Sequence, residues 1–466
     1  MGKLFVRDKN FYKQLVVIAL PVVLQSMINI GVNIMDTMML GSYGEIQISA
    51  SSLANDFIHI FMFTILGIGG GSAVLTAQYW GRQDIASLKK IITIMLRICL
   101  GLVLVFTVVT AAFPEQIMRI YTTDEAVIEK GIIYLRISIP TYLLMGLNMT
   151  LTAVLRSVRS VKIPLITVCV SFFVNIFSNW VFIFGKLGMP EMQIAGAALG
   201  TVIARVVESA IILTYVFKLD KKICYKLRDL FVSAKGYWVQ FFKYCLPVVG
   251  SDILFGFGNT MITIIIGHTN TEFVAANAIV ATIVRLTCVF TQGVANAGGI
   301  ITGNTIGAGK VEEGFRGAVT FLCLTVLTGA LSGVLILVLC PILVQFYDIS
   351  ETTYKIAREL MLAVATMSIF SAMENALTKG ILRAGGDTRF LLVADVLFMW
   401  VVSVPLGALV ALVWKAPPFL IYASLRVDWI IKTVWCTGRL ISRKWIHVVE
   451  SPDKPKVIAE PQGKGE

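Results

Sequence analysis

Charged residues are scarce in this chain, and their scarcity limits the class of protein it can be. Of the 466 residues, 15% are Asp, Glu, Lys or Arg and 57% are hydrophobic, and the mean hydropathy is +0.81. A soluble domain carries about 25% charged residues, so a water-soluble fold is excluded. Apolar runs too long for the strands of a membrane barrel recur along the whole chain, and lipid then permits only helices. The composition therefore predicts an all-α polytopic membrane protein.

Motifs for catalysis and nucleotide binding are also lacking. The chain has three histidines and eight cysteines, but no HExxH motif, nucleophile elbow, P-loop lysine or Cys-x-x-Cys pair. We therefore expect a protein that is not an enzyme, needs no cofactor, binds no structural metal and is not driven directly by ATP. No repeated selectivity-filter segment is present either, which argues against an ion channel.

What the sequence does contain is about twelve apolar runs that are long enough to cross a bilayer. We expect spans at residues 15–40, 52–79, 91–113, 131–155, 163–184, 194–217, 240–266, 273–305, 317–346, 356–381, 390–414 and 417–440. The first run is too long for a signal-peptide core and has no cleavage site at its end, so we expect it to be retained.

Basic residues concentrate in alternate loops, after every second span. The net charge of +12 is therefore explained by the positive-inside rule and does not indicate nucleic-acid binding. The other loops are acidic or balanced, and include Asp348. This pattern predicts a multi-pass protein of the plasma membrane with both termini in the cytoplasm.

An internal repeat divides the chain into two halves. Leu20-Pro21-Val22-Val23 recurs as Leu246-Pro247-Val248-Val249, and Gly81 recurs as Gly307 at the same offset along the chain. Leu155-Arg156 recurs as Leu382-Arg383 at an offset only one position longer. Six spans per repeat make the two halves parallel. We expect a six-helix lobe at residues 1–218, a cytoplasmic linker at 219–238, a second six-helix lobe at 239–446 and a disordered cytoplasmic tail at 447–466.

The first span carries polar residues that a membrane anchor would not need. Asp36 lies near its end, and a carboxylate in a span is costly unless it is paired, hydrated or protonated. The same helix contains further polar residues and methionines, and methionine suits a pocket that accepts varied apolar ligands. The resulting substrate-cavity candidates are Gln25, Asn29, Asn33, Met27, Met35, Met149 and Met261. The alternative for the methionines is ordinary packing.

Two asparagines and three further carboxylates are the other candidate site residues. Asn175 and Asn179 are four residues apart, so they share one helix face. Their alternative role is to join helices by hydrogen bonds. In the second half, candidates for a cation or substrate site are Asp252, Glu374 and Asp395, and the alternative for these is pairing with Lys379, Arg383 or Arg285. Arg205 and Glu208 are expected to form an internal ion pair.

Several stretches resemble the multidrug and toxic compound extrusion (MATE) family. They include ALPVVLQSMINIGVNIMDTMMLG in the first span, TGNTIGAGKVEEG after the eighth and GILRAGGDTRF after the tenth. The resemblance extends from Asn10 to about His447 and is of the DinF-like bacterial type. It implies two six-helix bundles around a V-shaped cleft, and export of organic, often cationic, compounds in exchange for H⁺ or Na⁺.

The resemblance also implies a cation-coupling site in the first lobe. By position, Asp36, Asn175, Asn179 and Thr201 match that site. The family often has Asp where this chain has Asn179, and the missing charge disfavours tight Na⁺ binding. In the second lobe, Asp252 and Glu374 match acidic positions of other branches, so the sequence leaves open which lobe couples.

The leading hypothesis is a secondary-active multidrug antiporter that works by alternating access. Its partners would be small, cationic organic substrates and membrane lipids, with H⁺ favoured over Na⁺ as coupling ion, and the protein would be a monomer. The alternative is a flippase for lipid-linked oligosaccharides or lipids, from the same superfamily. Flippases tend to have a strongly cationic central cavity, whereas the spans here carry carboxylates and amides.

Overall fold

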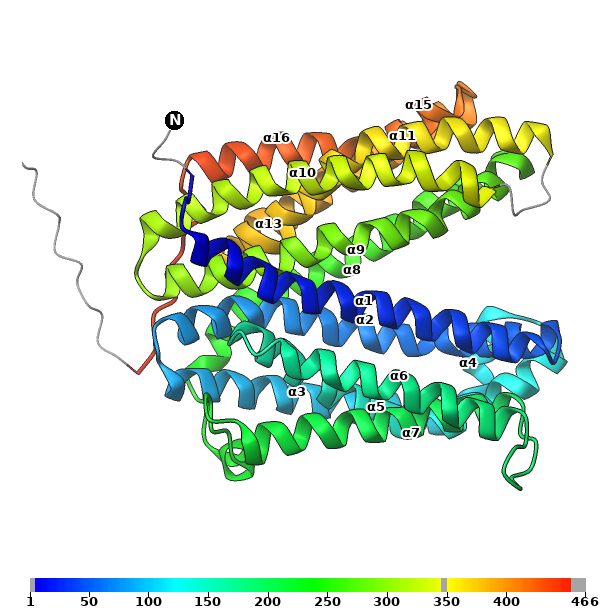
Figure 1. Ribbon diagram of the computed structural model, residues 1–466, viewed down its shortest axis with the longest axis horizontal. Coiled ribbons are helices and arrows are strands. Elements are labelled where there is room, and N and C mark those ends of the chain that lie inside the picture. The colour runs from blue at the N-terminus through cyan, green and yellow to red at the C-terminus, as the bar shows by residue number, and fades with distance from the viewer. Residues whose placement is uncertain (1–4, 345–349, 454–466) are drawn as a thin grey trace, which may run out of the picture.

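The computed structural model describes residues 5–344 and 350–453, which form helices joined by short connections (Figure 1). No strand occurs in these ranges, so the predicted all-α fold class is confirmed. Asp348 and residues 454–466 of the predicted tail lie outside the described residues.

The first half of the chain forms one bundle of long helices. Its elements are α1 (Lys9–Gly41), α2 (Glu45–Gly81), α3 (Ile85–Ala112), the short α4 (Pro114–Tyr121), α5 (Glu125–Ser157), α6 (Lys162–Ile183) and α7 (Ile194–Thr214), which continues as the π-helical turn η1 (Tyr215–Leu219).

The second half forms a similar bundle with more irregular helices. Its elements are α8 (Tyr237–Gly267), α9 (Thr271–Gly307), α10 (Val311–Val344), α11 (Glu351–Asn375) with η3 (Ala376–Ile381) and α12 (Leu382–Ala384), α13 (Thr388–Asp395) with η4 (Val396–Ser403), α14 (Val404–Ala408) and η5 (Leu409–Val413), and then α15 (Pro418–Leu425) and α16 (Val427–Ile441). Figure 1 shows the two bundles side by side with their long axes nearly parallel.

The repeat seen in the sequence is also present in the helix boundaries. Helices α1 and α8 end at Gly41 and Gly267, and α2 and α9 end at Gly81 and Gly307, which is the offset that relates Pro21 to Pro247. Helices α3 and α10 begin at the same offset. The two halves therefore repeat one helix order, and we call them the first and second lobes.

The number of spans differs slightly from the expected twelve. Among the described residues, ten helices are long and apolar enough to cross a membrane, and α9, bent by 43°, makes eleven. The twelfth expected span, 417–440, is instead divided between α15, with 8 residues, and α16, with 15. The break occurs at Arg426, and α16 carries Asp428 and Lys432, so this segment is shorter and more polar than its run of apolar residues suggested.

The two lobes touch where α2 crosses α9. A Cβ atom on Gly81 would overlap the backbone carbonyl of Asn304, and one on Gly307 would overlap the carbonyl of Gln78. Gln78 and Asn304 are themselves related by the repeat offset, so this contact is symmetric between the two halves. We call this part of the bundle the crossing end. Toward the opposite, far end the helices of the two lobes diverge (Figure 1).

The linker between the lobes is packed against α3. The ammonium of Lys89 donates to the carbonyl of Cys224 at 2.7 Å and contacts Asp229 at 3.1 Å. The Arg97 guanidinium donates to the carbonyl of Leu230 at 2.7 Å. The basic linker is therefore held on the first lobe by defined hydrogen bonds.

A segment after α16, residues 445–453, crosses from the second lobe to the first, and we call it the strap. Trp445 is fully buried and packs where Gly385 has no side chain. The amide of His447 donates to the carbonyl of Gly385 at 2.8 Å, and the amide of Val449 donates to the side-chain oxygen of Gln78 at 2.8 Å. The expectation of disorder from residue 447 onward is therefore wrong for residues 447–453.

The end of the strap is fixed by hydroxyl groups and one ion pair. Ser451 bonds to the hydroxyls of Ser87 at 2.9 Å and Tyr237 at 3.0 Å. Asp453 accepts from the Lys90 ammonium and from Tyr237, and these hydrogen bonds lower the pKa of the Asp453 carboxyl. The contribution of these bonds to stability is complete at neutral pH and is lost in acid, as the pH falls from the usual carboxyl range through the lowered pKa of the folded state.

The crossing of α2 and α9 yields a test of lobe packing. A methyl group at Gly81 or Gly307 must push the two backbones apart, and overpacking of this kind costs about 1–3 kcal/mol. We expect Gly81→Ala and Gly307→Ala to lower the thermal unfolding temperature of the purified protein. Gly101→Ala on α3 is the matched control, because nothing lies within 4 Å of its added Cβ. If both variants are as stable as Gly101→Ala, the close contact of the lobes is not as described.

Candidate functional site

The first-lobe candidates Asp36, Asn175 and Asn179 lie together at the far end of α1 and α6. The side-chain amide of Asn179 donates to Oδ1 of Asp36 at 2.6 Å, and its nitrogen lies 3.4 Å from Oδ1 of Asn175. Both asparagines are buried, whereas Asp36 is half-buried. The carboxylate is therefore held by one neutral donor at the edge of the lobe interior.

Asn179 also has a side-chain oxygen that accepts no hydrogen bond from the described residues. Its Oδ1 is buried and has no hydrogen-bond partner among the described residues. It faces α7 at Gly200, where a Cβ atom would overlap this oxygen. A buried acceptor without a donor costs about 1–3 kcal/mol, so its position beside a carboxylate favours a site that receives a proton or a cation.

Thr201 lies beside a tyrosine that the sequence analysis did not single out. The Thr201 side chain interacts with the hydroxyl of Tyr134 on α5, which accepts from the amide of Asn55 at 3.1 Å. Tyr134 is also close enough to Asp36 to interact with it electrostatically. The structure therefore places Thr201 next to the Asp36 group through Tyr134. A single tyrosine in an apolar span carries no pattern that could have indicated this.

Arg205 and Glu208 form the expected ion pair, at 2.6 Å. The pair lies on α7, and the Arg205 guanidinium is close enough to Asp36 for an electrostatic attraction between them. Arg205 opposes the addition of positive charge at Asp36, and its pairing with Glu208 offsets part of that effect.

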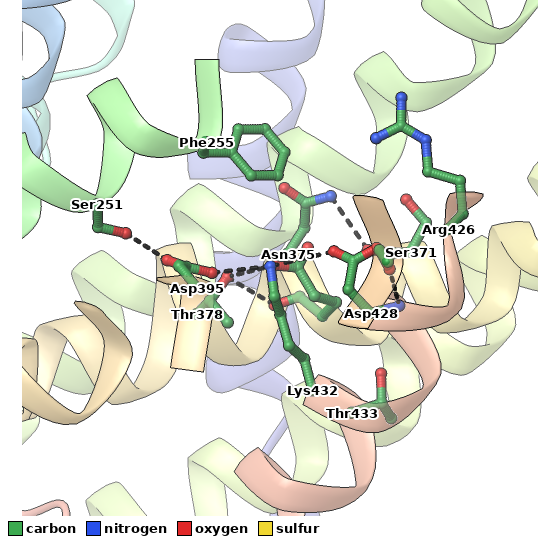
Figure 2. A network of polar contacts seen from close by, with 12 residues as sticks. Ser251, Phe255, Ser371, Asn375, Thr378, Asp395, Arg426, Asp428, Lys432 and Thr433 are labelled. Atoms are coloured by element: carbon green, nitrogen blue, oxygen red, sulfur yellow. Dashed lines mark hydrogen bonds and ion pairs between the residues drawn. The ribbon is translucent and has the colours of Figure 1, made fainter. Parts of the chain in front are cut away.

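The second lobe contains a larger charged group, shown in Figure 2. Lys432 on α16 is fully buried, and its ammonium nitrogen lies 2.8 Å from Asp395, 3.2 Å from Asp428 and 3.8 Å from Glu374. Each carboxylate also accepts from one hydroxyl: Ser251 to Asp395, Ser403 to Asp428 at 3.1 Å, and Thr378 to Glu374 at 3.1 Å. We call these four charged residues the second-lobe cluster.

Irregular helix geometry accompanies this cluster. The π-helical turn η3 begins two residues after Glu374, and η4 begins one residue after Asp395. Pro405 lies in the first turn of α14, two residues after η4 ends. Because proline has no backbone N–H, it cannot complete the α-helical hydrogen bonds of the preceding turn, which is η4. Such turns are frequent at functional sites.

Lys432 and Asp428 were not among the predicted site residues, although the sequence holds a signal for them. They are four residues apart in α16, so they share one face of the helix. Two opposite charges at this spacing in an apolar run indicate a buried pair. Glu374 and Asp395 were predicted, and the structure brings them together around Lys432.

Asp252 does not belong to the cluster. Its carboxylate forms an ion pair with Arg383 at 3.0 Å, which is one of the pairings considered as an alternative to a cation site. Arg383 packs against α2 at Gly70, where an added Cβ would lie 2.7 Å from the guanidinium. This pair therefore lies at the contact between the two lobes.

The cavity candidates are distributed over different environments. Gln25 is buried, accepts from the Arg156 guanidinium and lies 3.5 Å from the carbonyl of Val161, so both ends of its amide have protein partners. It therefore packs inside the lobe and does not face an open surface. The side chains of Asn29, Asn33 and Met27 are exposed, and those of Met35, Met149 and Met261 are half-buried. Their role in substrate binding stays a prediction.

The sequence was compared with known families and proteins. The MatE family model matches residues 21–181 and 247–409, one segment in each lobe. "Uncharacterized transporter YisQ" of Bacillus subtilis is 22% identical over 414 residues, covering 88% of this chain and 89% of that protein. "Probable multidrug resistance protein NorM" of Thermotoga maritima is 22% identical over 441 residues, covering 93% of each.

Solved structures agree with the fold. "Outward-facing conformation of a multidrug resistance MATE family transporter of the MOP superfamily" has a TM-score of 0.84 at 17% identity and covers 94% of this chain and 99% of that one. A MOP superfamily transporter from Pyrococcus furiosus, described by the "reverse polarity" of its binding pocket, has a TM-score of 0.83 at 17% identity, with 93% and 96% covered. With both repeats matched by the family model, this chain belongs to the MatE family of multi-pass membrane transporters.

Proposed function

We propose that this protein is a secondary-active antiporter that exports small organic cations in exchange for H⁺. The contact between Asp36 and Asn179, beside the Arg205–Glu208 pair, is the observation that carries the proposal. Family relatives named as multidrug resistance proteins support the substrate class.

The surroundings of Asp36 favour a proton over Na⁺. Sodium requires several oxygen ligands of net negative charge, whereas Asp36 has one neutral donor and a nearby guanidinium. A proton needs only one carboxylate oxygen and no further ligands. Arrival of a positively charged substrate in the same lobe would compete with that proton, and this competition couples the two movements.

We propose that the crossing end, both termini and the strap lie on the cytoplasmic side of the plasma membrane. The basic loops at alternate span ends support this orientation. The far end, where the lobes diverge and Asp36 lies, would then face outward. We propose that the protein works as a monomer, because each lobe contains its own group of charged residues.

Transport by reconstituted protein tests the coupling. We expect Asp36→Asn to reduce efflux of a cationic dye from proteoliposomes at least tenfold under an imposed pH gradient, because an amide cannot exchange a proton. The membrane potential is clamped, and a Na⁺ gradient of equal size is applied in a parallel experiment.

The matched control is Glu115→Gln on the surface helix α4, whose carboxylate is exposed and paired with Arg119. It should transport as the wild type does. Full pH-driven efflux by Asp36→Asn, or efflux driven only by Na⁺, would contradict proton coupling at Asp36. Gradient-independent movement of a labelled lipid, without dye transport, would support the flippase alternative.

The ion pair on α7 yields a second prediction. Glu208→Gln releases Arg205, which can then pair with Asp36 and oppose its protonation. If the new pairing stabilises the ionised form of Asp36 by about 1.4 kcal/mol, the protonated form becomes about ten times rarer. We therefore expect pH-driven efflux to be slower by about tenfold. Glu312→Gln, which breaks the exposed ion pairs of Glu312 with Arg316 and Arg443, is the control. Unchanged efflux by Glu208→Gln would show that Arg205 does not influence the carboxylate.

A further inference from the structure

The second-lobe cluster is an oxygen-rich site with a protein cation in its centre. Three carboxylates and three hydroxyls converge from α8, α11 with η3, α13 with η4, and α16. Oxygen ligands of this kind, with net negative charge, are the ones that bind alkali and alkaline-earth cations in proteins. Here the ammonium of Lys432 lies within 3.8 Å of all three carboxylates.

We propose that Lys432 is a tethered cation that excludes Na⁺ and K⁺ from the second-lobe cluster. It would thereby be the residue that decides the ion specificity of this lobe. The proposal deepens the proposed function, because it leaves Asp36 in the first lobe as the place where a coupling ion is exchanged.

The geometry explains why an added ion would have to displace Lys432. As they stand, no three acidic side chains among the described residues are spaced to hold a metal ion. An ion that used the three carboxylates of the cluster would have to draw them inward, toward the space that the ammonium occupies. Both cations cannot share that space, since two like charges at ligand distance repel strongly in a buried site. An ion bound by only one of the carboxylates would lack the other oxygen ligands that make the cluster suitable for a metal cation.

The lysine is held firmly in this position. Its side chain is fully buried, and the side chains of Asp428 and Glu374 are 0% and 3% exposed. Asp428 is one helical turn away on the same helix, and Ser403 fixes its orientation by two hydrogen bonds, one to its carboxylate and one from its amide. The ring of Phe255 covers the ammonium at 5.5 Å from the ring centroid.

A second lysine adds to the positive charge around the cluster. The ammonium of Lys379 lies 4.6 Å from the centre of the same Phe255 ring and interacts electrostatically with Glu374. Its side chain is exposed, so it does not occupy the cluster itself. It makes the approach of a free metal ion from that side less favourable still.

Removal of the lysine should therefore open a cation site. An ion that binds only the folded state raises the unfolding temperature, and the increase grows with the ion concentration relative to its dissociation constant. The measurement is the thermal unfolding of detergent-purified protein in equal concentrations of NaCl, KCl and choline chloride. All proteins compared carry Asp36→Asn, so that the first lobe does not contribute.

We expect the unfolding temperature of Asp36→Asn to be the same in the three salts. Asp36→Asn/Lys432→Met should unfold about 2–4 °C higher in NaCl than in choline chloride. Replacement by arginine keeps the charge, so Asp36→Asn/Lys432→Arg should show no such difference. Adding Asp395→Asn to the Met variant should abolish the sodium effect.

Two results would overturn the proposal: a sodium shift in Asp36→Asn itself, or no shift in folded Asp36→Asn/Lys432→Met. If the Met variant is recovered folded only from buffers with NaCl, the proposal is supported. If the Met variant is not recovered folded in any of the three salts, the less apolar Lys432→Gln replaces it, and the same criteria apply. Dye efflux is not part of this measurement, so failure of proton coupling at Asp36 would be recognised separately.

Discussion

Burial of charge in a bundle surrounded by lipid is the constraint on which this structure depends. An ionised side chain that leaves water needs a partner of opposite charge or a set of hydrogen bonds. Three cations described above have carboxylate partners: Arg205 has Glu208, Arg383 has Asp252, and Lys432 has three carboxylates. Asp36 differs, because its hydrogen-bond donor is the neutral amide of Asn179. The least compensated carboxylate is therefore the one best able to change its protonation.

The repeat relates these groups to one another. At the offset that joins Arg156 to Arg383, Arg205 corresponds to Lys432, so both lobes place a cation at an equivalent position of the last span. At the offset that joins the ends of α1 and α8, Asp36 corresponds to the buried Ile262. The lobes thus share a cation at this position, partly exposed in the first lobe and fully buried in the second, and differ in the carboxylates around it. One scaffold supports a carboxylate with a neutral donor in one lobe and an ion-pair network in the other.

Much of the fold could be predicted from the sequence because it follows from local regularities. Apolar runs of spanning length and a constant offset between matched residues are properties of the chain, and the helix ends of α1, α2, α8 and α9 agree with them. Asn175 and Asn179 could be grouped because four residues make one helical turn. The break at Arg426 was not predicted, since composition alone does not show where α15 ends and α16 begins.

The pairing of side chains between helices could not be predicted in the same way. Asp395 and Lys432 are brought together by the packing of η4, which continues α13, against α16, and no spacing in the sequence encodes that contact. Likewise, the choice of Arg383 and not Lys379 as the partner of Asp252 depends on the approach of α8 to α12. A single sequence indicates which charges are costly, and the tertiary structure decides how they are compensated.

The strap changes what a rocking motion of the two lobes entails. It leaves the second lobe after α16 and is hydrogen-bonded to Gln78 and Ser87 of the first, next to the crossing of α2 and α9. Lobes that separate at this end must break those bonds and withdraw the buried side chain of Val449 from the first lobe. The strap therefore adds to the free energy needed to separate the lobes at this end. Under the proposed alternating access, the sequence of the strap can therefore tune how easily the lobes separate at the crossing end without altering any of the candidate site residues.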